Sequence, residues 1–173
     1  MISISRNSAL YITMTVLLLA SALASGCQGS KGPTVSKGSV LPGISLPATD
    51  GRQLNIPGDM KGDLTVLLFW SQGCHYCKKE MPLIEPLYRK YRERGFSFVA
   101  IHMGPGMEAS REMKEEMGLS FPIAVDESSS LGKRYGIVSV PTMFVLDRNG
   151  IVLEKVLGGL GAGDLEKLIK ENI

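Results

Sequence analysis

The sequence is poor in cysteine and in aromatic residues, and neither sign of charge predominates. Three cysteines among 173 residues are too few for a small fold held together by disulfides. Aromatic residues make up 6% of the chain and the formal net charge is +2, which argues against a base-stacking platform and against a basic surface for nucleic acid. An apolar share of 44% and a charged share of 21% are instead typical of one globular domain.

Charged residues are missing from the stretch between residues 7 and 30. Within it, residues 9–24 are mostly apolar, a run shorter than a membrane-spanning helix usually needs, and small residues precede Cys27. This pattern predicts an export signal over residues 1–26. The segment from Leu23 to Cys27 also resembles a bacterial lipobox, which implies that Cys27 is acylated and becomes the mature N-terminus. An uncleaved signal anchor, or plain secretion, is the alternative.

The rest of the chain divides into a tether and a folded domain. Residues 27–39 are rich in glycine, serine and lysine and lack apolar periodicity, which predicts a flexible linker. Strand-like and helix-like segments alternate over residues 40–173. We expect strands at 44–48, 53–56, 64–70, 96–103, 121–125, 142–147 and 151–157, and helices at 75–94, 108–117, 129–135 and from 163 onward.

This alternation predicts an α/β fold. The continuous apolar runs at 64–70 and 96–103 are typical of strands that are buried on both faces of a sheet. Helices between strands favour a mainly parallel central sheet, and Asn149-Gly150 indicates a tight hairpin turn that adds antiparallel strands at the end. Pro82 and Pro86 predict a kink in the first long helix.

Two cysteines, Cys74 and Cys77, stand where a buried strand passes into a helix. Residues three apart on a first helical turn face the same side, with Cβ atoms about 5–6 Å apart, so this pair can close as a disulfide with little backbone movement. The helix N-terminus favours a thiolate on Cys74, whereas Cys77 lies one turn inside the helix. We therefore predict thiol–disulfide exchange in which Cys74 attacks and Cys77 resolves the mixed disulfide.

The segment WSQGCHYCKKEMP, residues 70–82, is similar to the active site of the thioredoxin fold, and in particular of the extracytoplasmic TlpA/ResA-like thiol–disulfide oxidoreductases. A second segment, SVPTMFVLD at 139–147, resembles their cis-proline loop. The resemblance extends over about residues 41–173. It implies a thioredoxin-like three-layer sandwich with a mixed central sheet and a short N-terminal β lead-in.

The resemblance also assigns residues to substrate binding. It implies a cis bond between Val140 and Pro141, with the backbone of Val140 offered to an extended substrate as in β-augmentation. Trp70, at the end of the buried strand, is expected to form a wall of the site.

Further residues near the cysteines bear on proton transfer and redox poise. Glu80 lies three residues after Cys77 on the same helix face and would accept its proton at resolution. The sequence has Gly73 where relatives usually carry an aromatic residue, and His75-Tyr76 between the cysteines. A protonated His75 would stabilise the thiolate and make the couple more oxidising.

Other chemistries for the CxxC segment are less consistent with the residues. A zinc site needs four ligands, and of the two histidines, His75 and His102, the first lies inside the CxxC segment. Haem attachment requires a histidine where Lys78 stands. A copper(I) metallochaperone using soft ligands near His102, Met103 and Met107, and a thiol peroxidase, are the alternatives. We expect no bound metal or cofactor.

The sequence therefore predicts an exported, lipid-anchored thiol–disulfide oxidoreductase on the extracytoplasmic or periplasmic side of a membrane. Its expected partners are thiols and disulfides of exported proteins, with no nucleic acid among them. The resemblance implies a reductant, for example in cytochrome c maturation, that is recharged by a thiol electron donor in the membrane. The residues leave open whether the couple reduces or oxidises its partner.

Overall fold

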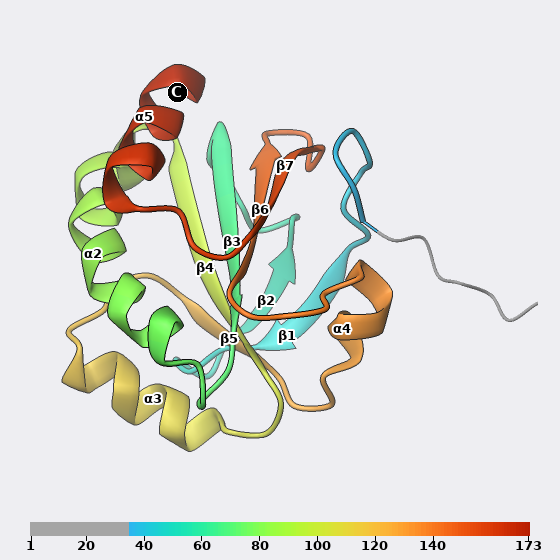
Figure 1. Cartoon of the computed structure of the whole chain (residues 1–173), viewed down its shortest axis with the longest axis vertical. Coiled ribbons are helices and arrows are strands. Elements are labelled where there is room, and N and C mark those ends of the chain that lie inside the picture. Colours follow the sequence, from blue (N-terminus) through green and yellow to red (C-terminus); the bar gives the residue numbers. More distant parts are fainter. Residues whose placement is uncertain (1–34) are drawn as a thin grey trace, which may run out of the picture. The chain divides into compact units, whose positions relative to one another are not determined.

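The computed structural model of the chain describes residues 35–173, so the predicted export signal and Cys27 lie outside the described residues. Within the described part of the chain, no helix is long and apolar enough to cross a membrane. Figure 1 shows the arrangement of the elements. In chain order these are β1 (Ile44–Pro47), β2 (Gln53–Ile56), β3 (Leu64–Trp70), α2 (His75–Tyr91), a 3₁₀ turn (Arg92–Arg94), β4 (Phe96–Met103), α3 (Met107–Glu116), β5 (Ile123–Asp126), α4 (Ser130–Tyr135), β6 (Thr142–Asp147), β7 (Val152–Leu157) and α5 (Ala162–Asn172).

A five-stranded mixed sheet in the order β5-β4-β3-β6-β7 forms the centre of the fold. β3 pairs in parallel with β4, and β4 with β5, whereas β6 and β7 run antiparallel to their neighbours. β1 and β2 form a separate antiparallel pair. The predictions of a mixed central sheet and of a β lead-in are confirmed.

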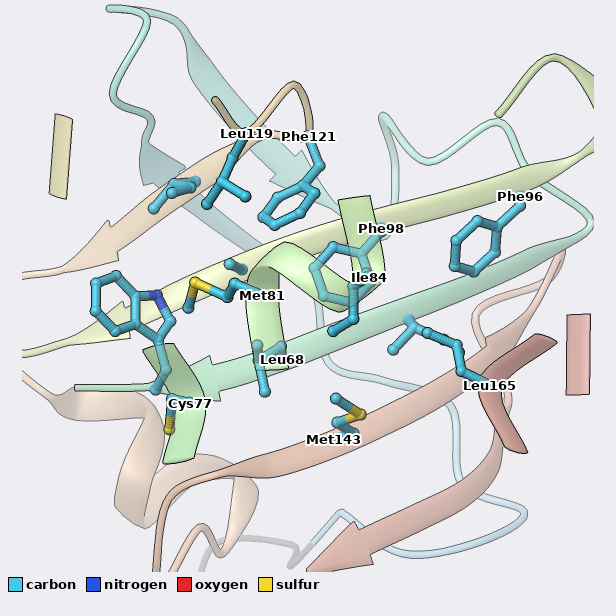
Figure 2. Close-up of a cluster of buried hydrophobic side chains, with 14 of the residues drawn as sticks. Leu68, Cys77, Met81, Ile84, Phe96, Phe98, Leu119, Phe121, Met143 and Leu165 are labelled. Atoms are coloured by element: carbon cyan, nitrogen blue, oxygen red, sulfur yellow. The ribbon is translucent and has the colours of Figure 1, made fainter. Parts of the chain in front are cut away.

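β3 is buried along its whole length because both faces of the sheet are covered. Leu68 and Trp70 point into a cluster with side chains of α2, α3 and α5, of which Figure 2 shows the core around Met81 and Ile84. Leu67 and Phe69 point to the opposite cluster, which contains side chains of β1, β2 and α4. The strand therefore separates two cores, and the three layers follow from its alternation.

α2 is shorter than the expected helix over 75–94. It runs without interruption through Pro82 and Pro86, both of which are exposed, and ends at Tyr91 before the 3₁₀ turn. Gly95, with φ of 96°, closes that turn in the left-handed conformation that favours glycine.

The ordered fold begins before residue 40, where the sequence predicts a flexible linker up to residue 39. Val35 is buried to 2% exposure. The Gly38 N–H donates to Val152 O at 2.8 Å, and the Leu41 N–H donates to Gly150 O at 2.8 Å. The turn before β7 and the first residue of β7 supply these partners, and a glycine- and serine-rich composition gives no sign of such long-range pairing.

Candidate active site

The two cysteines form a disulfide at the point where β3 gives way to α2. Their Cα atoms are 5.3 Å apart. Cys74 is the N-cap of α2, and its sulfur accepts a hydrogen bond from the Cys77 N–H at 3.2 Å. Cys77 is fully buried in the core cluster, and Cys74 is only partly covered. A partner can therefore reach Cys74 and not Cys77.

The start of α2 supplies a favourable electrostatic environment for a thiolate on Cys74. The first turn contains no acidic residue, and Lys78 and Lys79 follow directly after Cys77. Backbone N–H groups at the beginning of a helix carry a partial positive charge that stabilises an anion at the N-cap. The thiolate is the nucleophile in disulfide exchange.

The bond between Val140 and Pro141 is cis, as the resemblance implies. Val140 is half-buried and packs against both core clusters. Pro141 borders a groove of about 260 Å³ that also contains Glu80, so the loop before β6 and the second turn of α2 meet at one place. The residues that line the groove are Tyr76, Lys79, Glu80, Leu83, Pro141, Gly159 and Gly161.

Glu80 is half-buried in this groove and carries a strongly perturbed carboxyl group. Burial raises the pKa of Glu80 to about 7, although a hydrogen bond from the Leu160 backbone acts in the opposite direction. The carboxyl group packs directly against Gly159, where a Cβ atom would overlap both of its oxygens. A carboxyl group with a pKa near 7 can both take up and release a proton at neutral pH.

The loop between β7 and α5, residues 158–161, is a part of the site that sequence reasoning missed. It contacts Glu80 through Gly159 and Leu160. The stretch Gly-Gly-Leu-Gly is the signal that points to it, since closely spaced glycines often mark a place where another group approaches the backbone.

The other residues predicted for the site differ in how far they are buried. Trp70 is fully buried, so it lies beneath the site and presents no surface to a partner; its ring centroid is 4.7 Å from that of His102. His75 is exposed, 6.4 Å from the ring of Tyr76. Tyr76 and Leu83 are exposed to 77% and 58% and give the groove an apolar rim that the sequence analysis did not single out.

Residues 35–173 contain no group of three or more histidine, cysteine, aspartate or glutamate side chains that could hold a metal ion. Of the ligands considered for copper, His102 is buried to 2% exposure, while Met103 and Met107 are partly exposed.

A family model described as AhpC/TSA matches residues 38–155, more than half of the chain. The chain belongs to the AhpC/TSA family. Among the relatives of this AhpC/TSA chain is the thiol-disulfide oxidoreductase ResA of Bacillus cereus, which is 30% identical over 169 residues; the match covers 96% of this chain and 97% of the relative. ResA of Bacillus subtilis is 30% identical over 125 residues, covering 72% and 69%.

Solved structures lead to the same conclusion for this AhpC/TSA chain. The thiol:disulfide interchange protein DsbE from Chlorobium tepidum matches with a TM-score of 0.72 and 28% identity, over 80% of this chain and 99% of that one. StoA from Bacillus subtilis matches with a TM-score of 0.63 and 26% identity, over 75% and 98%. The fold is thioredoxin-like, and the protein is a thiol–disulfide oxidoreductase of the ResA/DsbE type with Cys74 and Cys77 as its CxxC pair. The predicted fold and reaction class are confirmed.

Proposed function

We propose that this oxidoreductase reduces disulfides of exported proteins while anchored to a membrane by its N-terminus. The observation that carries the reaction is the pairing of a reachable Cys74 with a buried Cys77, one turn before the half-buried Glu80. The sequence pattern before Cys27 supports export and anchoring.

In the first step the reduced enzyme attacks a disulfide of the partner. The Cys74 thiolate bonds to one partner sulfur, and the other partner sulfur leaves with the electron pair of the broken S–S bond. The product is a mixed disulfide between Cys74 and the partner. The α2 N-terminus stabilises the attacking thiolate.

In the second step the enzyme resolves the mixed disulfide. Cys77 loses its proton to Glu80, and the resulting thiolate attacks Cys74 Sγ, so that the intramolecular disulfide forms and the second partner sulfur leaves as a thiolate. The partner has gained two electrons and the enzyme has lost them. A thiol electron donor in the membrane then returns the Cys74–Cys77 pair to the dithiol.

The partner is held by the surfaces around Cys74. We infer that an extended segment of the partner lies along Val140 and Pro141, where the Val140 backbone offers hydrogen bonds to it, and that His75 contacts it from the start of α2. Trp70 packs beneath the cysteine pair and supports it from the core. The apolar rim of Tyr76 and Leu83 suits a protein surface better than a small polar thiol.

The experiment that tests the reaction uses the two cysteine variants with a model protein disulfide such as insulin. Cys74→Ser should abolish reduction, because the nucleophile is lost. Cys77→Ser should trap a mixed disulfide that is visible on a non-reducing gel. Glu80→Gln should prolong the lifetime of the mixed disulfide more than it slows the first attack. Full activity of the Cys74→Ser protein would overturn the proposal.

Membrane anchoring needs a test of its own, because it depends on residues before the described fold. With Cys27 acylated by more than one chain, the exported protein should stay in the membrane fraction. Cys27→Ala should release it to the soluble fraction. Retention of the Cys27→Ala protein in the membrane would indicate an uncleaved helix instead.

The direction of electron flow follows from the reduction potential of the pair. A value near that of thioredoxin, about −270 mV, supports a reductant, whereas a value near that of DsbA, about −120 mV, supports an oxidant. If His75 stabilises the Cys74 thiolate, His75→Ala should raise the pKa of Cys74 and lower the reduction potential. Reduction of an apocytochrome disulfide by the anchored protein would support a role in cytochrome c maturation.

A further inference from the structure

His102 is a buried titratable side chain for which the exchange mechanism has no use. It lies at the end of β4, paired in register with Trp70 on β3, and its exposure is 2%. The two ring centroids are 4.7 Å apart with an interplanar angle of 47°. The imidazole therefore packs on the indole that underlies the cysteine pair.

The imidazole also packs against the turn that leads into α3. A Cβ atom at Gly106 would lie 2.7 Å from His102 Cε1 and 3.2 Å from Nδ1. Gly106 also adopts φ of 152° as the N-cap of α3, so two independent constraints require glycine there. The turn Gly104–Gly106 therefore packs against the imidazole ring of His102.

The Nδ1 atom of His102 has no hydrogen-bond partner among residues 35–173. The N-terminus of α3 begins beside it, because Gly106 is the N-cap of that helix and a Cβ atom added to Gly106 would lie 3.2 Å from Nδ1. A neutral ring with a lone pair at Nδ1 suits that position, whereas an imidazolium would place a positive charge against a helix N-terminus.

The charged groups that act on the imidazole come from the neighbouring elements. Lys78 on α2 repels a proton on it, and Glu127 after β5 attracts one. Glu108 on the first turn of α3 is paired with Arg111 at 2.5 Å, and the strand neighbour Val125 is uncharged. Burial has the largest effect and lowers the pKa of His102. Glu127 and a hydrogen bond with the Gly104 backbone raise it, and Lys78, with the smallest effect, lowers it.

We propose that His102 is a positioning residue of the redox site: as a neutral imidazole it locks the Gly104–Gly106 turn onto Trp70, and its protonation opens that packing. Figure 1 shows that α2 and α3 begin at the same end of the sheet. Trp70 shares its core cluster with Cys77. Loss of the packing therefore removes support from under the first turn of α2, and the site works less well in acid.

The first test uses the oxidised protein, in which the cysteines carry no titrating thiol. Trp70 is the only tryptophan, and an imidazolium quenches indole fluorescence more strongly than a neutral imidazole. Fluorescence should fall on acidification with a midpoint below the ordinary histidine value of about 6.5. The change should vanish in His102→Asn and in His102→Gln, and persist in the matched variant of the only other histidine, His75→Asn, and in Glu80→Gln. Quenching that survives in His102→Asn would overturn the proposal.

The second test needs no variant of His102 and so does not depend on the folding of one. The ring proton signals of the two histidines are followed by NMR against pH, with His75→Asn assigning them. The amide signals of Gly104 and Gly106 should shift with the midpoint of His102, because the turn opens when the ring is charged. A normal His102 midpoint, or glycine signals that do not follow it, would contradict the inference.

The last step of this inference rests on the proposed function and is tested separately. The ratio of wild-type to His102→Asn activity on insulin disulfides should decrease about threefold or more as the pH falls through the His102 midpoint. A constant ratio would refute a positioning role even if the fluorescence and NMR results hold. Inactivity of both proteins at every pH would instead count against the proposed substrate, while the two tests on the oxidised protein still decide the switch.

Discussion

At the scale of single residues, the acid–base behaviour of the site depends on burial more than on residue type. Glu80 is an ordinary helix glutamate in the sequence, yet burial against Gly159 raises its pKa to about 7. Lys79 beside it is exposed and solvated. The difference between them is the loop that happens to cover Glu80, because desolvation penalises the charged form of a carboxyl group.

The raised pKa of Glu80 predicts a pH dependence of stability. The folded protein keeps Glu80 protonated up to about pH 7, whereas the unfolded chain releases that proton near 4.5. Between these values the folded state binds more protons, so the contribution of Glu80 to the free energy of unfolding decreases as the pH rises and is constant above the window. Glu80→Gln should lose this decrease.

The measurement is the urea midpoint of the oxidised protein from pH 4 to 8, wild type minus Glu80→Gln at each pH. His102 has the opposite effect, because its lowered pKa makes the free energy of unfolding rise with pH below about 6.5. Both proteins contain His102, so the difference between them removes its contribution. Parallel curves for the two proteins would mean that Glu80 titrates normally.

Gly159→Ala tests whether Gly159 holds Glu80 in place. The added methyl group would overlap the carboxyl oxygens, and the flexible end of the glutamate should swing towards water. We expect the pKa of Glu80 to fall towards its usual range, a mixed disulfide that persists longer, and a stability change within about 1 kcal/mol. Carboxyl NMR titration and trapping of the mixed disulfide measure the first two effects. Gly163→Ala, where nothing lies within 4 Å of the new methyl group, is the matched control and should leave both unchanged.

At the scale of elements, α2 must be held in place for the cysteines at its start to be positioned. Glu85, 7% exposed, accepts hydrogen bonds from the Ser120 N–H at 2.8 Å and from Ser120 Oγ at 2.6 Å. It also pairs with Arg89 at 2.5 Å. These contacts connect the middle of α2 to the segment that leads into β5.

Glu85→Gln should therefore weaken the attachment of α2. Burial alone would raise the pKa of Glu85, but the hydrogen bonds from Ser120 and the ion pair with Arg89 outweigh it and hold the pKa below its usual value. Loss of the charged partner should cost about 1–3 kcal/mol at neutral pH. Because the folded-state pKa is lowered, this stabilisation is present above about pH 4.5 and disappears as the pH falls through the folded value.

Denaturant midpoints at neutral and at acid pH measure this effect. Glu93→Gln is the control, since that side chain is 84% exposed in its pair with Arg92 and exposed pairs contribute little. An equal loss in both variants, or a loss that does not shrink in acid, would contradict the interpretation.

At the scale of the whole described domain, the two cores share β3 and should unfold together. Leu67 and Trp70 are both fully buried, on opposite faces of that strand. Leu67→Ala should lower the free energy of unfolding by about 2–5 kcal/mol. The unfolding curve followed by Trp70 fluorescence should shift as far as the one followed by far-UV circular dichroism, because one cooperative unit gives one transition.

Leu157→Ala is the matched comparison, because Leu157 is 62% exposed and its loss should change stability by no more than about 0.5 kcal/mol. If Leu67→Ala shifted the circular dichroism curve and left the Trp70 curve in place, the two cores would be independent.

The sequence alone determined the order of the elements, the α/β fold and the cysteine pair. These depend on local rules: apolar runs buried on both faces of a strand, 3.6-residue spacing along α2, and two cysteines one turn apart at a helix start. The cysteine pair indicated the reaction class, and a resemblance carried by two short segments then indicated the family. Each of these signals is contained in fewer than twenty consecutive residues, so a linear reading can detect it.

Only the tertiary structure decided which side chains lose contact with water. Residues 38–41 pair with residues 150–152, Glu80 meets the loop at Gly159, and His102 packs against Trp70 and Gly106. The partners in the first two contacts are about eighty or more positions apart in the chain, and the indole and imidazole come from different strands. Desolvation depends on how such distant segments close on one another, and it is desolvation that sets the pKa of Glu80 and of His102. The cysteine pair can therefore be recognised from a short stretch of sequence, whereas the pKa values of the groups around it depend on the fold.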